Sequence, residues 1–138
     1  MDKKDILEFI NSCKIFHLAT VEGDKPHVRA MMLYRADEKG IIFHTGKTKD
    51  LNKQLCANPK VELCFNNFQK NIQIRVVGFV VPVESLELKK EIVSKREFLK
   101  PWIEEFGFEL FAVYCVKSAT ATIWTFETNF APKSYIEL

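Results

Sequence analysis

Residues 15–34 read IFHLATVEGDKPHVRAMMLY, and this stretch is the most informative part of the sequence about the fold. Its first part, Ile15–Val21, is largely apolar, and Glu22–Pro26 follows it as a polar run of turn-forming residues. Its last part, His27–Tyr34, is largely apolar again. Two short apolar runs separated by Gly, Asp and Pro are typical of a β-hairpin. The stretch therefore predicts two antiparallel strands joined by a short turn.

Short apolar runs separated by short turns continue along the rest of the chain. Five of them are expected to be strands, at Ile41–Thr45, Val61–Phe65, Ile72–Val83, Leu110–Val116 and Ala119–Phe126. Gly78 lies inside the longest run, where a glycine marks a bulge or a bend. Because such short turns join antiparallel strands, six or seven antiparallel strands are predicted in all. With helices packed outside them, they indicate a mainly β fold, either a barrel or a sandwich.

Three segments carry apolar residues at helical spacing instead and are expected to be helices, and a fourth is expected to form only a short helical turn. Asp5–Cys13 and Glu84–Phe98 each place them on one face, and a short helical turn is expected at Trp102–Phe106. The third helix follows Thr48, which is expected to be its N-cap, and ends at Asn58, before a proline. The helices are therefore expected to alternate with groups of strands along the chain.

The composition narrows the class of protein. The chain has 138 residues, of which 47% are hydrophobic, so residues 1–138 are expected to form a single domain with its own core. The 20 Lys and Arg residues against 18 Asp and Glu residues leave a net charge of +2, which argues against nucleic acid as a partner. No apolar stretch approaches the about 18 residues of a membrane span, and the N-terminus is too polar for a signal peptide.

The cysteines and the aromatic residues have structural interpretations. No C-x-x-C pair and no histidine at zinc-ligand spacing accompany the four cysteines, Cys13, Cys56, Cys64 and Cys115. A metal site is therefore not expected, and we interpret the cysteines as reduced, buried residues of a cytoplasmic protein. The aromatic residues from Trp102 to Phe111 are expected in the core or in a dimer interface.

The candidate site is the segment Phe43–Lys49, which joins a predicted strand to the start of a predicted helix. It offers the hydroxyls of Thr45 and Thr48, a glycine that permits close backbone approach, and the charges of Lys47 and Lys49. The free N–H groups of the first helical turn add donors at the same place. Together these groups predict a cradle for a phosphate.

Arg29 is a further cationic group for this cradle. By the two-residue period of a strand it faces the same way as His27 and Met31, and the hairpin return is expected to bring it near Thr45. An arginine, a lysine and a helix N-terminus that converge on one point fit a phosphomonoester. The alternative is an ordinary surface, where the lysines are solvated charges and Thr48 only caps the helix.

Four segments combine into a recognisable order, at Leu18–Arg29, Phe43–Leu51, Leu55–Leu63 and Ile74–Gly78. They resemble the opening hairpin, the phosphate-binding turn, the next helix end with its strand, and the following long strand of the pyridoxamine 5′-phosphate oxidase-like, FMN-binding split β-barrel family. The order and spacing agree over about residues 5–85. The ATVEGDKP form of the first turn is most similar to the nitroimidazole-resistance, or Nim-type, branch.

The resemblance implies an antiparallel split β-barrel that binds FMN at the interface of a homodimer. Ten residues would then contact the cofactor: Arg29, Met31, Met32, His44, Thr45, Lys47, Thr48, Lys49, Gln73 and Trp124. By the same resemblance Arg29 and Lys49 would hold the phosphate, with hydrogen bonds from Thr45 and Thr48. The backbone of Met31, Met32 and His44 would lie along the isoalloxazine ring and its side chain, and Gln73 would contact the cofactor. Trp124 would approach the ring from the second subunit.

The chain departs from the family where a vitamin B6 phosphate would bind. True pyridoxamine-phosphate oxidases carry a C-terminal Arg-x-His pair, which Ala121–Glu127 lacks, and Tyr34 stands where a substrate-binding lysine is expected. The resemblance therefore implies an FMN-dependent oxidoreductase for a small acceptor, with a nitro compound as one candidate, and His44 as the best histidine for a substrate or flavin contact. The alternatives are a non-catalytic flavin or haem carrier and a deazaflavin-dependent reductase on the same barrel.

Overall fold

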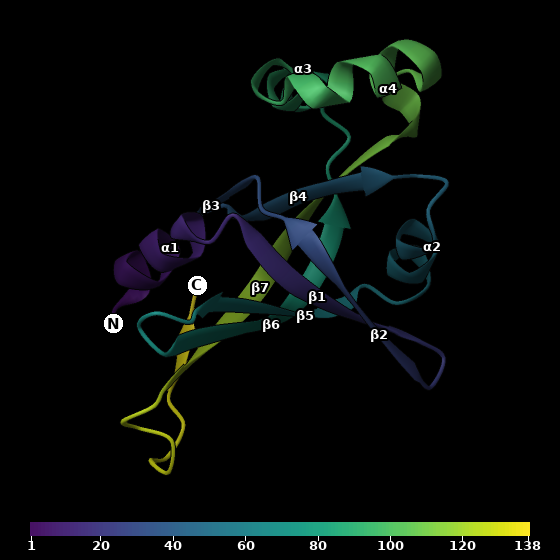
Figure 1. The fold of residues 1–138 in the computed structure, drawn as a ribbon. Coiled ribbons are helices and arrows are strands. Elements are labelled where there is room, and N and C mark those ends of the chain that lie inside the picture. Colours follow the sequence, from purple (N-terminus) through teal and green to yellow (C-terminus); the bar gives the residue numbers. More distant parts are fainter.

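The computed structural model describes residues 1–138 and confirms a mainly antiparallel β fold. One sheet runs in the order β2-β1-β5-β6-β7-β4-β3, and β8 pairs with β7. The strands are β1 (Ile15–Glu22), β2 (Lys25–Met32), β3 (Arg35–Asp37), β4 (Gly40–Gly46), β5 (Lys60–Asn67), β6 (Ile72–Pro82), β7 (Phe111–Thr125) and β8 (Tyr135–Glu137). The sheet curls until β2 lies beside β4 without forming a ladder (Figure 1). The barrel is therefore split between these two strands.

Helices surround the sheet. They are α1 (Lys3–Ser12), α2 (Asp50–Ala57), α3 (Leu86–Lys95) and α4 (Lys100–Phe106), with short 3-10 turns η1 (Glu97–Leu99) and η2 (Phe108–Leu110). Figure 1 shows α3 and α4 as one layer over β4, and α2 beside the end of β4. None of these helices combines the length and the apolar character that a membrane crossing needs.

The start of α2 differs from the prediction. Lys49, not Thr48, is the N-cap, and no side chain caps the helix. The Lys49 backbone N–H instead donates to the Gly46 carbonyl at 3.1 Å, so a tight turn precedes the helix and leaves Thr48 outside it. No side chain accepts from the first turn of α2, and the Asn52 and Lys53 N–H groups donate to the Lys49 carbonyl, so the Asp50 and Leu51 N–H groups remain available to a ligand.

The helix predicted over Glu84–Phe98 is shorter at both ends. The Ser85 side chain accepts a hydrogen bond from the Leu88 backbone N–H at 3.1 Å and starts α3, which ends before Arg96. Pro101 then lies in the first turn of α4, where the N–H that a proline lacks would have no partner anyway. The resulting bend between α3 and α4 places Arg96 at the edge of the layer that faces β4.

The two strands predicted at Leu110–Val116 and Ala119–Phe126 are one strand, β7. The prediction of a break at the polar pair Lys117 and Ser118 was wrong, because the ladder with β6 continues on both sides of the pair. Ser118 takes a φ of 48°, so the strand bends there instead of ending.

Gly78 forms the predicted bulge opposite this bend. The register between β6 and β7 shifts between Val77 and Phe79. A Cβ atom on Gly78 would lie 2.7 Å from the Lys117 carbonyl oxygen, closer than a carbon atom tolerates. The absence of a side chain at Gly78 therefore allows the two strands to bend together.

Two short strands lie outside the predictions. The strand expected to run to Tyr34 ends at Met32, and β3 then turns back to pair with β4. Near the C-terminus, β8 pairs with residues 120–122 of β7. Each of these strands has three residues, which is too short for an alternating pattern to be visible in the sequence.

The hydrophobic core consists of two clusters. The larger one fills the barrel, where Phe16 stacks on Phe65 with ring centroids 5.2 Å apart and meets the edge of Phe43 at 5.9 Å. The smaller one lies between the α3–α4 layer and the strands β4 and β7, and its buried members are Ile42, Ile92, Val93, Phe111, Val113 and Cys115. This second cluster holds the layer in a fixed position over β4.

The cysteines are free thiols, but they are not uniformly buried. Cys13 and Cys115 are buried, as expected. Cys56 is exposed and Cys64 is half-buried, so the expectation was wrong for these two. Cys56 lies on the solvent-facing side of α2, where the sequence gives an isolated cysteine no distinguishing signal.

Candidate functional site

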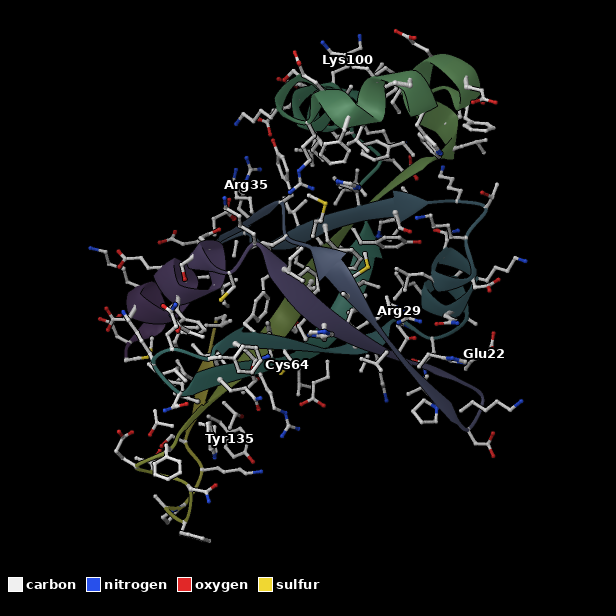
Figure 2. All side chains as sticks on the ribbon, in the orientation of Figure 1. Glu22, Arg29, Arg35, Cys64, Lys100 and Tyr135 are labelled. Atoms are coloured by element: carbon white, nitrogen blue, oxygen red, sulfur yellow. The ribbon has the colours of Figure 1, made fainter.

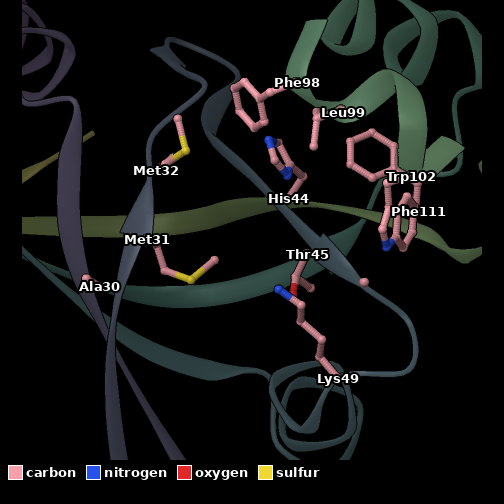
Figure 3. Close-up of a pocket in the computed structure, with 11 residues that line it drawn as sticks. Ala30, Met31, Met32, His44, Thr45, Lys49, Phe98, Leu99, Trp102 and Phe111 are labelled. Carbon is pink, nitrogen blue, oxygen red and sulfur yellow. The ribbon is translucent and has the colours of Figure 1, made fainter. Parts of the chain in front are cut away.

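A pocket of about 400 Å³ opens where β2 and β4 lie side by side (Figure 3). Ala30, Met31 and Met32 of β2 form one wall. Met31 packs partly against the barrel core, whereas the Met32 side chain is 41% exposed. The two methionines of the predicted site therefore do lie together at the split of the barrel.

The opposite side of the pocket carries unpaired polar groups. Thr45 is 8% exposed, yet its hydroxyl has no hydrogen-bond partner in the protein and keeps solvent access. Lys49 forms no ion pair, and its side chain lines the pocket together with Thr45 (Figure 3). The Thr48 backbone N–H donates to no acceptor in the protein. These free donors and the ammonium charge make this end of the pocket suited to an anionic oxygen.

The α3–α4 layer closes the pocket with apolar side chains. Phe98 and Leu99 of η1, Trp102 of α4 and Phe111 of β7 line this wall. The rings of Trp102 and Phe111 meet edge to face at 6.0 Å, and a Cβ on Gly46 would lie 3.4 Å from Trp102. A flat, apolar ligand fits such a wall.

This wall was missed by the sequence analysis. Trp102 and Phe111 were expected in the core or in a dimer interface, and Phe111 does belong to the second core cluster. Their position over β4 depends on how the α3–α4 layer packs, which is a tertiary contact. The only signal in the sequence is the density of aromatic residues around a helix break, and a core helix gives the same signal.

His44 extends from β4 toward the α3–α4 layer. Its Nε2 atom lies 2.6 Å from Nη1 of Arg96, and its ring centroid lies 5.0 Å from that of Phe111. Burial lowers the pKa of His44 to about 4, and the charges of Arg96 and Lys49 act in the same direction. At neutral pH the imidazole is therefore uncharged.

Arg96 is itself held by a cluster of groups. Its Nη2 donates to the Leu33 carbonyl at 2.5 Å, and its guanidinium lies 5.2 Å from the centre of the Tyr34 ring. The Tyr34 hydroxyl donates to Glu91 at 2.5 Å. Burial and the Glu91 carboxylate raise the pKa of Tyr34 to about 12, so the hydroxyl keeps its proton. Tyr34 therefore supports Arg96 and does not line the pocket.

Arg29 lies beside the pocket but not in its lining. Its guanidinium donates to Oε1 of Gln54 at 2.5 Å and to the Thr20 hydroxyl at 2.9 Å (Figure 2). Thr20 and Gln54 are both buried, and the Thr20 hydroxyl also donates to Gln54. Arg29 thus joins β2 to Gln54 on the inner side of α2.

Lys47 and Thr48 do not line the pocket. The Lys47 ammonium lies 3.4 Å from a carboxylate oxygen of Glu84, and the residue lines a different cavity behind α2. The Thr48 side chain is exposed, and only its backbone N–H faces the turn that carries the unpaired donors. The structure therefore separates the two lysines of the segment.

Gln73 and Trp124 lie in a separate groove at the other end of the sheet. They are cross-strand partners on β6 and β7. Gln73 donates to Asn66 at 2.9 Å, and the Trp124 indole N–H donates to Asn129 at 2.8 Å. Within one protomer these two residues are not brought to the pocket.

The same face of the sheet nevertheless carries the β2 wall and the groove. Cross-strand partners share a face, and the pairs Val28–Ala19, Ala19–Glu62 and Glu62–Val77 connect β2 to β6. We call this surface the open sheet face. Its exposed apolar residues include Ile15, Val28, Met32, Val77, Phe79 and Trp124, which are between 37% and 68% exposed.

Comparisons with known proteins identify relatives over most of the chain. A model of the pyridoxamine 5′-phosphate oxidase family matches residues 2–125. The pyridoxine/pyridoxamine 5′-phosphate oxidase of Hyphomonas neptunium is 36% identical over 86 residues, which are 62% of this chain and 39% of that protein. The enzyme of the same name from a Bradyrhizobium strain is 29% identical over 111 residues, or 78% and 51% of the two chains. The chain thus spans about half the length, or less, of these relatives.

Solved structures agree in fold over nearly the whole chain. A NimC/NimA family protein from Clostridium acetobutylicum is 31% identical, with a TM-score of 0.79 over 98% of this chain and 92% of that one. General stress protein 26 of Bacillus anthracis is 22% identical, with a TM-score of 0.74 over 99% and 98%. A pyridoxamine 5′-phosphate oxidase-related, FMN-binding protein from Nostoc punctiforme is 14% identical, with a TM-score of 0.65 over 99% and 96%.

These matches cover the strands and the turn that form the pocket. The family model covers the hairpin, the turn before α2 and the long strands on which the resemblance was predicted. The chain belongs to the pyridoxamine 5′-phosphate oxidase-like family.

Proposed function

We propose that the pocket between β2 and β4 binds FMN and that the protein is an FMN-dependent oxidoreductase for a small acceptor. One observation carries this proposal: the unpaired polar groups of Thr45 and Lys49 lie at one end of a pocket whose other wall is aromatic, and the free Thr48 N–H lies in the turn next to Lys49. A phosphate fits the donors, and a flat ring fits the wall. Both parts of FMN therefore have a matching surface in one pocket.

Arg29 would strengthen the phosphate end. Its guanidinium is bound to Gln54 in the second half of α2, and burial lowers its pKa without removing its charge, because an arginine stays protonated at any physiological pH. The positive end of α2 and the Lys49 ammonium add to the same field. We propose Arg29, Thr45, Thr48 and Lys49 as the phosphate-binding residues.

The ring end depends on apolar contacts. Met31 and Met32 offer polarisable thioethers on one side, and Trp102 covers the other. When bound, FMN supplies electron transfer to and from a substrate, and the protein supplies orientation and a site with little water. His44 adds a neutral hydrogen-bonding group at the edge of this apolar region.

The open sheet face supports a homodimer. Six apolar residues of this face are exposed in the protomer, and an exposed apolar patch is typical of an interaction surface. The pocket opens at one part of this face, and the groove of Gln73 and Trp124 lies at another. We propose a two-fold dimer of this domain in which Gln73 and Trp124 of the partner subunit reach the FMN.

The relatives support the same class of function. The Nostoc protein is described as FMN-binding, and the Clostridium protein as a member of the NimC/NimA family. The chain lacks an Arg-x-His pair in β7 and its loop, so we propose an acceptor other than a pyridoxamine phosphate. A nitro compound is the acceptor to test first.

The test is the identity and the reactivity of the bound cofactor. We expect the purified protein to be yellow, to release FMN on denaturation as shown by mass spectrometry, and to oxidise a nicotinamide donor while it reduces a nitroarene. A haem absorption band or a released deazaflavin would contradict the choice of cofactor. Bound FMN that no donor reduces would support a carrier and contradict the oxidoreductase.

A further inference from the structure

We propose that Arg96 is a positioning residue that fixes His44 as a hydrogen-bond donor of the pocket, with the Nδ1–H group available to an acceptor atom of the bound ligand. The inference deepens the proposed function, and it rests on that function only for the identity of the ligand. The state of the His44 ring is a property of the protein without any ligand, so it can be tested separately.

The contact between the two side chains determines where the imidazole proton lies. A guanidinium has five N–H donors and no acceptor. Nε2 of His44, at 2.6 Å from Nη1 of Arg96, must therefore present its lone pair. A neutral imidazole has one N–H group, so its proton lies on Nδ1. Nδ1 makes no hydrogen bond in the protein and is not among the buried unpartnered atoms.

Arg96 is held firmly enough to impose this choice. Three contacts fix its guanidinium: the Leu33 carbonyl, the face of the Tyr34 ring and His44 itself. Tyr34 is fixed in turn by its hydrogen bond to Glu91, a residue of α3. The planar guanidinium of Arg96 thus has little freedom to turn away from Nε2 of His44. Arg96 itself lies at the bend that follows α3.

The groups that face His44 also oppose its second proton. Arg96 and Lys49 are the charged groups that act on the ring, and both are cationic. Phe111 packs against it with an apolar ring. The nearest acid of the cluster, Glu91, accepts from Tyr34 and pairs with Arg35 at 3.5 Å, so it does not face the imidazole. His44 therefore stays a neutral donor as the pH falls through the range in which a free histidine titrates.

This state selects the ligand atom that His44 can meet. A carbonyl, nitro or ring-nitrogen acceptor can take the Nδ1–H bond, whereas an ammonium or another donor cannot. The two nearby cations favour an acceptor with partial negative charge for the same reason. We therefore assign the pocket an uncharged or anionic ligand with an acceptor atom next to its aromatic wall.

The test reads the imidazole nitrogens by NMR in the protein without FMN. In protein labelled with ¹⁵N-histidine, two-bond ¹H–¹⁵N spectra distinguish a protonated ring nitrogen from an unprotonated one. The chain has three histidines, and His44→Gln identifies the signals of His44. We expect its Nδ1 to be protonated and its Nε2 unprotonated from about pH 5.5 to about pH 8. Histidines ordinarily titrate within this interval.

Three variants separate the hydrogen bond from the charge. Arg96→Met removes both, and we expect His44 to change to a mixture with the Nε2–H form and to titrate at higher pH. Arg96→Gln replaces a group that can only donate with an amide that can donate or accept, so we expect a mixture of the two forms there. Lys49→Met removes only a charge, so we expect it to keep the Nδ1–H form while the pKa of His44 rises. Amide spectra of each variant report whether the fold is intact.

Two results would overturn the inference: an Nε2–H form in the wild type, or an unchanged Nδ1–H form in folded Arg96→Met. If Arg96→Met does not fold, an unchanged Nδ1–H form in folded Arg96→Gln would contradict it equally. FMN titration of the same proteins reports the proposed function independently. A wild type that has the Nδ1–H form but binds no FMN would contradict only the proposed function.

Discussion

Two lysines of one short turn, Lys47 and Lys49, face different cavities. Lys47 pairs with Glu84 behind α2, whereas Lys49 is unpaired at the end of the pocket. Both are basic residues that flank Thr48 in the sequence, and nothing local distinguishes them. The direction of each side chain depends on the turn before α2, whose N-cap is Lys49 and not Thr48.

The phosphate end can be tested by a matched pair of lysine variants. Lys49→Ala should weaken FMN binding by about tenfold or more, because it removes a charge-assisted contact to the phosphate. Lys47→Ala should change it by less than about twofold, because this ammonium is already paired on the other side. Fluorescence titration with FMN measures both, and equal affinities in the two variants would exclude the assignment of Lys49.

Arg29→Ala is predicted to weaken FMN binding more than Lys47→Ala does. It should also lower the free energy of unfolding without ligand by about 1–3 kcal/mol, because buried Thr20 and Gln54 lose their donor. Chemical denaturation of the ligand-free protein separates the two effects. An Arg29→Ala protein that binds FMN as tightly as Lys47→Ala would remove Arg29 from the phosphate site.

The pKa of His44 makes the stability of the protein depend on pH. The unfolded chain binds a proton at His44 below about pH 6.5, whereas the folded protein does so only near pH 4. Folding is therefore penalised as the pH falls from 6.5 to 4, by about 3 kcal/mol at most. His44→Gln should lose less free energy of unfolding than the wild type over this interval. Parallel losses in denaturant titrations of the two proteins would contradict the lowered pKa.

At the scale of elements, the strands could be predicted better than their junctions. Short apolar runs between turns predicted β1, β4, β5 and β6, and Gly78 predicted the bulge, because these features are local. The continuity of β7 through Lys117 and the pairing of β8 depend on neighbouring strands. The α3–α4 layer was predicted as helices, but its place over β4, and with it the aromatic wall, depends on the second core cluster.

The bulge supplies a test at this scale. Gly78→Ala should lower the free energy of unfolding by about 2–3 kcal/mol, because a Cβ there would meet backbone of β7. Gly23→Ala should cost only about 1 kcal/mol, because a Cβ at Gly23 meets nothing within 4 Å and only its φ of 61° is unfavourable. A cost for Gly78→Ala no larger than that for Gly23→Ala, measured by urea denaturation, would show that the close approach of β6 and β7 is not fixed.

At the scale of the whole molecule, the predicted site falls into two groups of residues. Met31, Met32, His44, Thr45 and Lys49 meet in the pocket, whereas Gln73 and Trp124 lie in a groove elsewhere on the open sheet face. The family resemblance placed them in one site because it implied two subunits. A single protomer cannot bring them together, and the homodimer is the arrangement that we propose to do so.

The open sheet face gives the test of this assembly. Val28→Lys should convert the dimer to a monomer and weaken FMN binding, because it places a charge in an apolar interface. Leu86→Lys changes a side chain of similar exposure, 52% against 68%, on α3, and should leave the dimer intact. Light scattering after size-exclusion chromatography measures the mass of each variant. A dimeric Val28→Lys protein, or a monomeric wild type, would contradict the proposed interface.

The most direct measurement compares FMN with riboflavin, which has the same ring system without the phosphate. The pocket unites an aromatic wall with the unpaired polar groups of Thr45 and Lys49, next to the free Thr48 N–H, so the phosphate should contribute much of the affinity. In fluorescence titrations of the wild-type protein we expect FMN to bind at least about a hundredfold more tightly than riboflavin. We expect Lys49→Ala to narrow that ratio. Equal affinity for the two flavins, or no binding of either, would contradict the assignment of this pocket as a site that binds FMN through its phosphate.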